Sequence, residues 1–241
     1  MTNLDYKQFT RRHRPHIHPP GAVLFVTCRL AGSVPKSTVR DYKSKKQWLE
    51  NELKRAQGVM RGSEAPELKK WFERIETFKR DWFLKFEAIL HQANVGPMWM
   101  RDERVAGSVA ESLRVLDGKA YRLDAFSVMS NHIHTIFKPF VAENNLREIK
   151  ADDNHPLFIS DYPGLSRIMH SVKGHSAREC NLMLSRSGSF WEHESFDHVI
   201  RHGKFDSTMK YVLNNPIKAG LVKHWRDWPW NYCRKELSDK F

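Results

Sequence analysis

The chain has 241 residues, of which 40% are hydrophobic, and this is enough apolar sequence for a folded core and excludes a largely disordered protein. Its 40 Lys and Arg residues outnumber 28 Asp and Glu residues, which gives a formal net charge of +12. No apolar run approaches the roughly 18–20 residues of a membrane-spanning helix. A basic chain of this kind favours a polyanionic partner, most commonly nucleic acid, although a charge that serves only solubility is an alternative.

The three cysteines, Cys28, Cys180 and Cys233, lie far apart and show no Cys-x-x-Cys spacing. They therefore predict neither a disulfide framework nor a zinc ribbon, and they suit a reducing cytosol. The N-terminal sequence carries charges without an apolar segment after them, so it does not resemble a secretory signal. We expect a cytoplasmic protein.

The first strand is predicted over residues 21–30, GAVLFVTCRL, which are continuously apolar and follow a Pro-Pro-Gly turn. Two helical stretches follow. Residues 37–60 are mostly charged, and residues 65–93 place large apolar side chains three and four positions apart, which is typical of an amphipathic helix. Because β-type sequence resumes only after them, we expect a helical hairpin inserted at about residues 37–93.

The remaining elements alternate between helices and strands. Residues 104–118 predict a helix that ends at a glycine, and residues 121–129 and 132–138 predict two strands joined by the link Ser-Asn. Helices are predicted over residues 165–184, with a basic face, and over residues 204–215, with a short strand between them. This order predicts one α+β domain over the whole chain, with an antiparallel sheet covered by helices.

Two histidines, His132 and His134, lie one residue apart in a predicted strand. Side chains at i and i+2 project from the same face, about 6–7 Å apart at the backbone, so the two imidazoles can hold one divalent ion. Ile133 between them is expected to face the core. A second His-Ile-His occurs at His16 and His18, but the prolines and arginines around it disfavour a central strand, so we expect a solvated or phosphate-facing loop there.

A third ligand is expected from elsewhere, and the helix predicted over residues 204–215 offers Asn215. Tyr211 precedes Asn215 by four residues, so the two share a helix face. An amide oxygen suits Mg²⁺ or Mn²⁺, which also accept imidazole. A phenol beside a cation that polarises a phosphate oxygen can attack phosphorus. Equally, Tyr211 fits a core aromatic residue, and Asn215 fits a helix-terminal residue before Pro216.

Three segments resemble the REP-associated tyrosine transposases, relatives of the HUH-type single-tyrosine insertion-sequence transposases. They are RRHRPHIHPPGAVLFVTCRLAGSVP, SVMSNHIHTIFKP and FDHVIRHGKFDSTMKYVLNNPIKAGLV. The resemblance implies a ferredoxin-like fold with a central antiparallel sheet. It implies His132 and His134 as metal ligands and Tyr211 as the nucleophile, and Asn215 stands where relatives supply a polar third ligand. The family usually has proline where Ser130 stands, which changes the turn that enters the site but removes no ligand.

The activity that the resemblance implies is transposase-like cleavage and rejoining of single-stranded DNA. The substrate would form a REP-type hairpin, the intermediate would be a 5′-phosphotyrosine, and one Mg²⁺ or Mn²⁺ would be required, in the bacterial nucleoid. No GxxxxGK[ST] run is present, which agrees with a reaction that keeps its energy in the ester. His198 is predicted either to support the metal ligands or to have a local structural role.

A DNA-binding surface is predicted from basic residues. The candidates are Arg11, Arg12, Arg14, Lys173, Arg178, Arg201 and Lys218. Any one of them can equally be a solvated charge, but together they resemble a phosphate track. Nothing marks a self-complementary surface, so both a monomer and a homodimer fit.

Two rival functions fit the same residues. One is a non-catalytic protein that binds structured nucleic acid and derives from a transposase. The other is a metal-dependent nuclease that uses water, with Tyr211 as a core residue. A covalent protein–DNA adduct separates these alternatives, because only a tyrosine nucleophile produces one.

Overall fold

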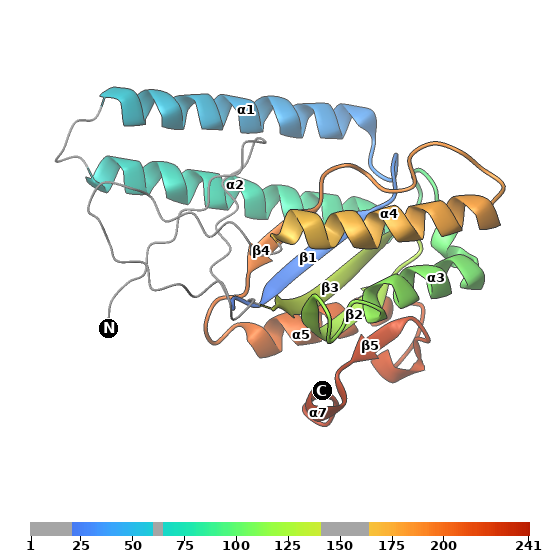
Figure 1. Cartoon of the computed structure of the whole chain (residues 1–241). Coiled ribbons are helices and arrows are strands. Elements are labelled where there is room, and N and C mark those ends of the chain that lie inside the picture. Colours follow the sequence, from blue (N-terminus) through green and yellow to red (C-terminus); the bar gives the residue numbers. More distant parts are fainter. Residues whose placement is uncertain (1–20, 60–64, 141–163) are drawn as a thin grey trace. The chain divides into compact units, whose positions relative to one another are not determined.

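The computed structural model describes residues 21–59, 65–140 and 164–241 of the chain. The chain divides into two compact units. The first combines Met1–Arg29 with Trp99–Phe241 and contains the sheet, and the second, Leu30–Met98, contains two long helices (Figure 1). The prediction of a single domain with an insertion stays a prediction.

A five-stranded antiparallel sheet in the order β4-β1-β3-β2-β5 forms the first unit. Its strands are β1 (Leu24–Arg29), β2 (Tyr121–Val128), β3 (His132–Pro139), β4 (Phe196–Val199) and β5 (Asn231–Cys233). Helix α3 (Glu103–Arg114) precedes β2, and α4 (Leu165–Met183) lies between β3 and β4. The first four strands and these two helices follow the β-α-β-β-α-β order of a ferredoxin-like fold. The predicted α+β fold with a central antiparallel sheet is confirmed.

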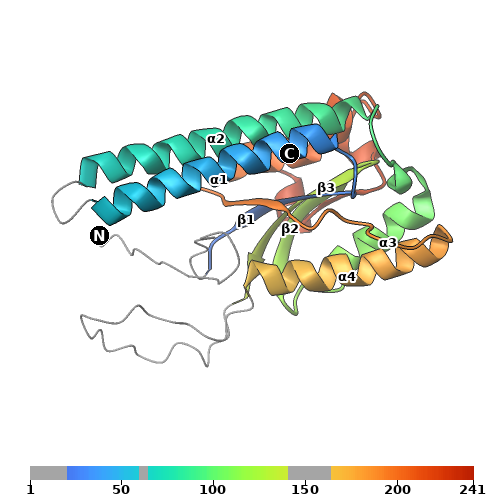
Figure 2. The ribbon, with the colours of Figure 1, turned by 90° about the horizontal axis from the view of Figure 1, so that it is seen from above.

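Helices cover both faces of this sheet. Figures 1 and 2 show α3 and α4 next to each other on one face, and α5 (Phe205–Leu213) packs on the other, against β2 and β3. The shorter helices of the unit are the 3₁₀ turns at Trp99–Arg101 and Trp225–Asp227, α6 (Asn215–Lys218) and α7 (Lys235–Ser238). Because both faces of β1 are covered, its apolar residues lie on both faces of the strand rather than on one face only.

The turn between β2 and β3 consists of Ser130 and Asn131, as the sequence predicts. The Met129 N–H donates to the His132 carbonyl over 2.9 Å, and the Met100 N–H donates to the Ser130 carbonyl over 3.2 Å. Within the described residues, no non-glycine residue of this turn has a positive φ. The turn is therefore neither type I′ nor type II′, and Ser130 does not have the positive φ that would exclude proline.

Ser130→Pro is therefore expected to raise the free energy of unfolding by about 0.4–1 kcal/mol, because proline restricts the unfolded chain at a position with a negative φ. Urea unfolding of the full chain measures the change. A loss of stability would show instead that the turn needs the N–H or the hydroxyl group of Ser130.

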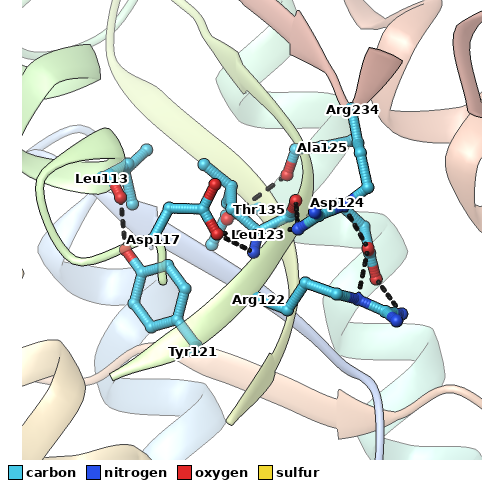
Figure 3. Close-up of polar contacts among 9 residues, drawn as sticks. All are labelled: Leu113, Asp117, Tyr121, Arg122, Leu123, Asp124, Ala125, Thr135 and Arg234. Atoms are coloured by element: carbon cyan, nitrogen blue, oxygen red, sulfur yellow. Dashed lines mark hydrogen bonds and ion pairs between the residues drawn. The ribbon is translucent and has the colours of Figure 1, made fainter. Parts of the chain in front are cut away.

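A β-bulge interrupts β2 between Leu123 and Ala125 and makes Asp124 the extra residue. The Asp124 carboxylate is fully buried and accepts from Arg122 Nε at 3.2 Å and from Arg234 Nε at 3.1 Å (Figure 3). Arg234 also donates to the Leu123 carbonyl. These contacts join the end of β5 to β2, so the C-terminal segment is part of the sheet.

Asp124→Ala is expected to lower the free energy of unfolding by about 3 kcal/mol, because it removes a fully buried carboxylate and leaves the partly buried Arg234 guanidinium with only its longer, 3.5 Å ion pair to Asp117. Urea unfolding measures the loss. The exposed Asp239→Ala is the matched control and is expected to stay within about 0.5 kcal/mol of the parent. Equal stabilities of the two variants would mean that the buried ion pair contributes nothing.

The tryptophan-rich C-terminal segment belongs to the first unit, where Trp228 Nε1 donates a hydrogen bond to the Val128 carbonyl at 3.0 Å. Strand β5 within it was not predicted. Three residues are too few for an alternating pattern, and pairing with β2 decides that they form a strand.

The second unit is a helical hairpin of α1 (Lys36–Val59) and α2 (Ala65–Gln92), which agrees with the predicted pair of helices. Tyr42 of α1 meets three aromatic rings of α2, those of Phe78, Trp82 and Phe86, at centroid distances of 5.4–5.5 Å. Their spacing of four residues puts them on one side of α2. None of the described helices is long and apolar enough to cross a membrane.

Candidate metal and tyrosine site

His132 and His134 lie on β3, on the face of the sheet that packs against α5. Their ring centroids are 4.7 Å apart and their ring planes are inclined by 74°. Both imidazoles are buried, with exposed fractions of 1% and 0%. Ile133 is buried as well and points to the opposite face. The strand geometry is the predicted one, and the role of the two histidines as metal ligands stays a prediction.

Each imidazole has a polar partner at its Nδ1 atom. His132 Nδ1 lies 2.7 Å from Asn131 Oδ1, and His134 Nδ1 lies 2.8 Å from Thr27 Oγ1. Because an amide oxygen only accepts, His132 Nδ1–H is the donor and Nε2 carries the ring lone pair. The Thr27 hydroxyl can accept from His134 in the same way. Metal-binding histidines commonly have such a partner on the second nitrogen, so the donor set fits a divalent ion bound through both Nε2 atoms.

Sequence reasoning missed both of these partners. Asn131 could have been found from the sequence, because it directly precedes His132 at the start of the strand. Thr27 had none, because it reaches His134 only through the pairing of β1 with β3, in which these two residues are opposite each other.

Asn131→Ala is expected to weaken Mn²⁺ binding by about 10–100-fold, because His132 loses the acceptor that orients its ring. Titration calorimetry of the full chain with Mn²⁺ measures the effect. Asn131→Asp keeps an acceptor and should bind almost as tightly as the parent, and Asn51→Ala on the exposed face of α1 should change nothing. Unchanged affinity in Asn131→Ala would contradict the orienting role.

Tyr211 of α5 meets His134 edge-on, with ring centroids 5.5 Å apart and planes inclined by 67°. Phe25 of β1, which the sequence reasoning did not single out, lies 5.5 Å from His134 and 5.9 Å from Tyr211. Tyr211 is half-buried rather than fully enclosed. The fold thus brings the predicted nucleophile to the predicted ligand pair, with Phe25 as an apolar neighbour of both.

The helix after Tyr211 differs from the prediction. A single helix over residues 204–215 was expected, but α5 ends at Leu213 and Asn215 is the first residue of α6. Pro216 is accommodated in the first turn of α6, where its missing N–H costs no hydrogen bond. Asn215 is fully buried. Tyr211 and Asn215 therefore do not share the face of one helix, and the role of Asn215 as a ligand stays a prediction.

Lys218, at the end of α6, places its ammonium group 4.4 Å from the centroid of the Tyr211 ring. The segment after Tyr211 thus brings a positive charge back to its ring. An Asn231 amide also holds this region, since Nδ2 donates to the Leu213 and Trp225 carbonyls over 2.9 Å each. The end of α5 is fixed in this way although the helix is short.

His198 lies on β4, opposite Phe25 in the pairing with β1. Its ring is 5.0 Å from that of Phe25 and 5.8 Å from that of Phe196. Phe25 thus contacts both His198 and His134. The prediction that His198 supports the metal ligands stays a prediction.

The predicted DNA-binding residues separate into groups. Arg201 is exposed in the loop before α5, and the Lys218 ammonium group lies over the Tyr211 ring. Lys173 and Arg178 lie on α4, which covers the other face of the sheet (Figure 1). Arg11, Arg12 and Arg14, and with them His16 and His18, lie outside the described residues. A common DNA-binding role for the set stays a prediction.

Lys173, which was predicted to bind DNA, also makes hydrogen bonds within the protein that the sequence did not predict. Its Nζ atom donates to the carbonyls of Glu192 and His193 over 2.7 and 2.9 Å and to Ser195 Oγ over 3.3 Å. Ser195 Oγ in turn lies 3.2 Å from the buried Cys28 Sγ. The ammonium group therefore holds the segment before β4 in place.

The second unit has a pair of potential metal ligands of its own. Glu87 and His91 lie one turn apart on α2, with Oε2 and Nε2 at 3.7 Å. The four-residue spacing was readable from the sequence but was not singled out. Each unit therefore contains two side chains of types that can ligate a divalent ion, His132 and His134 in the first and these two in the second.

Comparisons with known proteins give one relative and one related structure. No protein-family model matches the chain. A Haemophilus influenzae protein, provisionally named a REP-associated tyrosine transposase, is 23% identical over 120 residues, which cover 47% of this chain and 60% of that protein. A solved structure of a REP-associated tyrosine transposase bound to a REP hairpin aligns over 92% of this chain and 82% of its own, at 14% identity and a TM-score of 0.41. The resemblance predicted from the motifs is confirmed, and the match spans less than two thirds of the relative.

Proposed function

We propose that this chain, which resembles the REP-associated tyrosine transposases, cleaves and rejoins single-stranded DNA that carries a hairpin. The observation that supports this most is the contact between Tyr211 and His134. It brings a half-buried phenol to a buried pair of imidazoles whose Nδ1 atoms have polar partners. These are the groups that a metal-assisted attack by tyrosine on phosphorus requires.

His132 and His134 would hold the ion through their Nε2 atoms, and Asn215 would add its amide oxygen. A hard ion with mixed nitrogen and oxygen ligands is Mg²⁺ or Mn²⁺. When bound, it supplies polarisation of a non-bridging phosphate oxygen. The chain itself orients the two imidazoles through Asn131 and Thr27 and keeps water from their buried faces.

In the chemical step, the Tyr211 oxygen forms a bond to phosphorus and loses its proton. The bond from phosphorus to the 3′ oxygen breaks, and that oxygen gains a proton. The products are a 5′-phosphotyrosine and a free 3′-hydroxyl. Attack by this hydroxyl group, or by that of another strand, reverses the exchange and joins DNA without ATP. The Lys218 ammonium group, which lies over the Tyr211 ring, is placed to attract the scissile phosphate.

A covalent protein–DNA adduct tests the proposal. A labelled hairpin with a single-stranded flank is incubated with the protein and Mn²⁺ and run on a denaturing gel. An adduct supports tyrosine chemistry. Nicking without an adduct supports a nuclease that uses water. Binding without nicking supports a non-catalytic protein that binds structured DNA. We expect the adduct, and we expect the protein to act at the bacterial nucleoid.

A further inference from the structure

Helix α1 of the second unit carries a line of cationic and amide side chains, which we call the α1 stripe. Its members follow one another at intervals of three or four residues, so they lie on one face of the helix. They are Lys36, Arg40, Lys43, Gln47, Asn51 and Lys54, and all six residues are exposed. The stripe extends over about 27 Å along the helix axis.

The stripe is separate from the face of α1 that packs on α2. Tyr42 and Leu49, seven residues apart, are buried with exposed fractions of 8% and 6%. Tyr42 stacks on Phe78 of α2 at a centroid distance of 5.5 Å, and Figures 1 and 2 show the two helices side by side. Packing of the hairpin therefore does not need the charges of the stripe.

The ion pairs of α1 involve cations outside the stripe. Lys46 Nζ lies 3.7 Å from a carboxylate oxygen of Glu50, and Arg55 Nη1 lies 2.7 Å from one of Glu52. Within the part of the chain that the structure describes, the four cations of the stripe form no ion pair. A helix face that is merely solvated usually mixes charges of both signs. The stripe instead has the charge of one sign that a polyanion-binding surface requires.

Two amides supply hydrogen-bond donors in the middle of the stripe. Gln47 Nε2 donates to Asn51 Oδ1 over 2.9 Å, so the amide oxygen of Asn51 is engaged and its nitrogen keeps two N–H donors. Lysine, arginine and amide side chains are the groups that contact phosphate oxygens in complexes with DNA. The stripe is thus composed of phosphate-binding side chains over its whole length.

The composition of the stripe favours a duplex over a membrane or a single strand. A helix that lies on a membrane buries an apolar face in the lipid, and the stripe has no apolar residue. Single-stranded nucleic acid is bound largely by stacking of its bases on aromatic rings, and the stripe has no aromatic residue either. Trp48 is exposed outside the stripe, and the Lys45 ammonium group lies 4.2 Å from the centroid of its ring. Phosphate contacts alone suit a duplex, whose bases are already paired.

We propose that the α1 stripe binds the phosphate backbone of double-stranded DNA of any sequence, with its four cations on phosphate oxygens and its two amides between them. Its length of about 27 Å approaches one turn of B-DNA, roughly 34 Å. The inference goes beyond the proposed function, because every residue proposed for cleavage belongs to the first unit. Such a surface keeps the protein on duplex DNA independently of the hairpin that it cleaves.

Binding of the full chain to a blunt DNA duplex of unrelated sequence tests the proposal. Fluorescence anisotropy measures the affinity, with a chelator present so that no cleavage interferes. The stripe variant combines Lys36→Gln, Arg40→Gln, Lys43→Gln and Lys54→Gln. It is expected to bind the duplex at least about tenfold more weakly, and the slope of log affinity against log salt should fall by about one for each lost phosphate contact. Circular dichroism checks that the helix is kept, as glutamine is a good helix former.

The control variant removes the same amount of charge from the same unit at cations that are already paired. Their carboxylate partners lie 2.7–3.7 Å away. The substitutions are Lys46→Gln, Arg55→Gln, Lys79→Gln and Arg80→Gln. The duplex affinity of this variant should stay close to that of the unaltered protein. At saturating protein, both variants should form as much covalent adduct with the hairpin as the unaltered protein, because Tyr211 lies in the first unit.

Four results would overturn the stripe proposal. If the unaltered protein does not bind the duplex, no such surface exists. Equal weakening in the two variants would assign duplex binding to net charge, and equal weakening for a single strand of the same length would assign the stripe to single-stranded DNA. If the stripe variant loses binding only to vesicles of phosphatidylserine and phosphatidylcholine, the partner is a membrane. The proposed function fails by a different result, namely that the unaltered protein forms no covalent adduct.

Discussion

Replacing Tyr211 with phenylalanine is expected to abolish the covalent protein–DNA adduct and to reduce cleavage by at least about 10⁴-fold, the order seen when a nucleophile is removed. Phenylalanine keeps the ring that contacts His134 and Phe25 and removes only the attacking oxygen. The fold and hairpin binding should therefore be preserved. The measurement is a denaturing gel of labelled hairpin DNA in Mn²⁺, with circular dichroism as a check of folding.

Tyr232→Phe is the matched control for this experiment. Tyr232 lies on β5, where its ring stacks on Phe126 at 5.4 Å, on the face of the sheet away from His134. It should form as much adduct as the unaltered protein. An adduct that persists in Tyr211→Phe would show that another residue is the nucleophile. Cleavage without an adduct in both proteins would assign the reaction to water.

Replacing His132 and His134 together with alanine is expected to weaken Mn²⁺ binding by more than about 100-fold. The loss should exceed the 10–100-fold effect of an outer partner such as Asn131, because here the ligating atoms themselves are removed. Cleavage should fall with metal binding, while the hairpin should still bind. Titration calorimetry with Mn²⁺ measures the affinity. In the unaltered protein, a chelator should stop cleavage, and added Mn²⁺ should restore it.

His170→Ala is the control, since His170 is exposed on α4. It should bind Mn²⁺ like the unaltered protein. If the double variant at His132 and His134 keeps full affinity, the ion is held elsewhere. Glu87 and His91 of the second unit would then be the next pair to replace.

The placement of the two histidines could be predicted from the sequence because it depends on local geometry. Residues i and i+2 of any strand share a face, so His132 and His134 had to point together once β3 was recognised. The same holds for α2, whose aromatic residues recur every four positions, and for the order of strands and helices. Family motifs then singled out Tyr211 over the other tyrosines of the chain.

The break between α5 and α6 could not be predicted in this way. The segment around Pro216 reads as the end of one helix or the start of the next, since proline fits both. Asn231, which lies 18 residues further along the chain, donates a hydrogen bond to the Leu213 carbonyl where α5 ends. The choice depends on a contact that is distant in sequence.

The sequence by itself thus predicted which residues carry the chemistry, and it determined on which strand face the two imidazoles lie. Only the tertiary structure decided what surrounds them. Thr27 stands behind His134 because β1 pairs with β3 in one register, and a shift of one residue would turn its side chain to the other face. The bulge at Asp124 depends likewise on pairing with β3 and on the contact with Arg234 after β5. Strand register and bulges are properties of two strands together, so neither strand alone contains them.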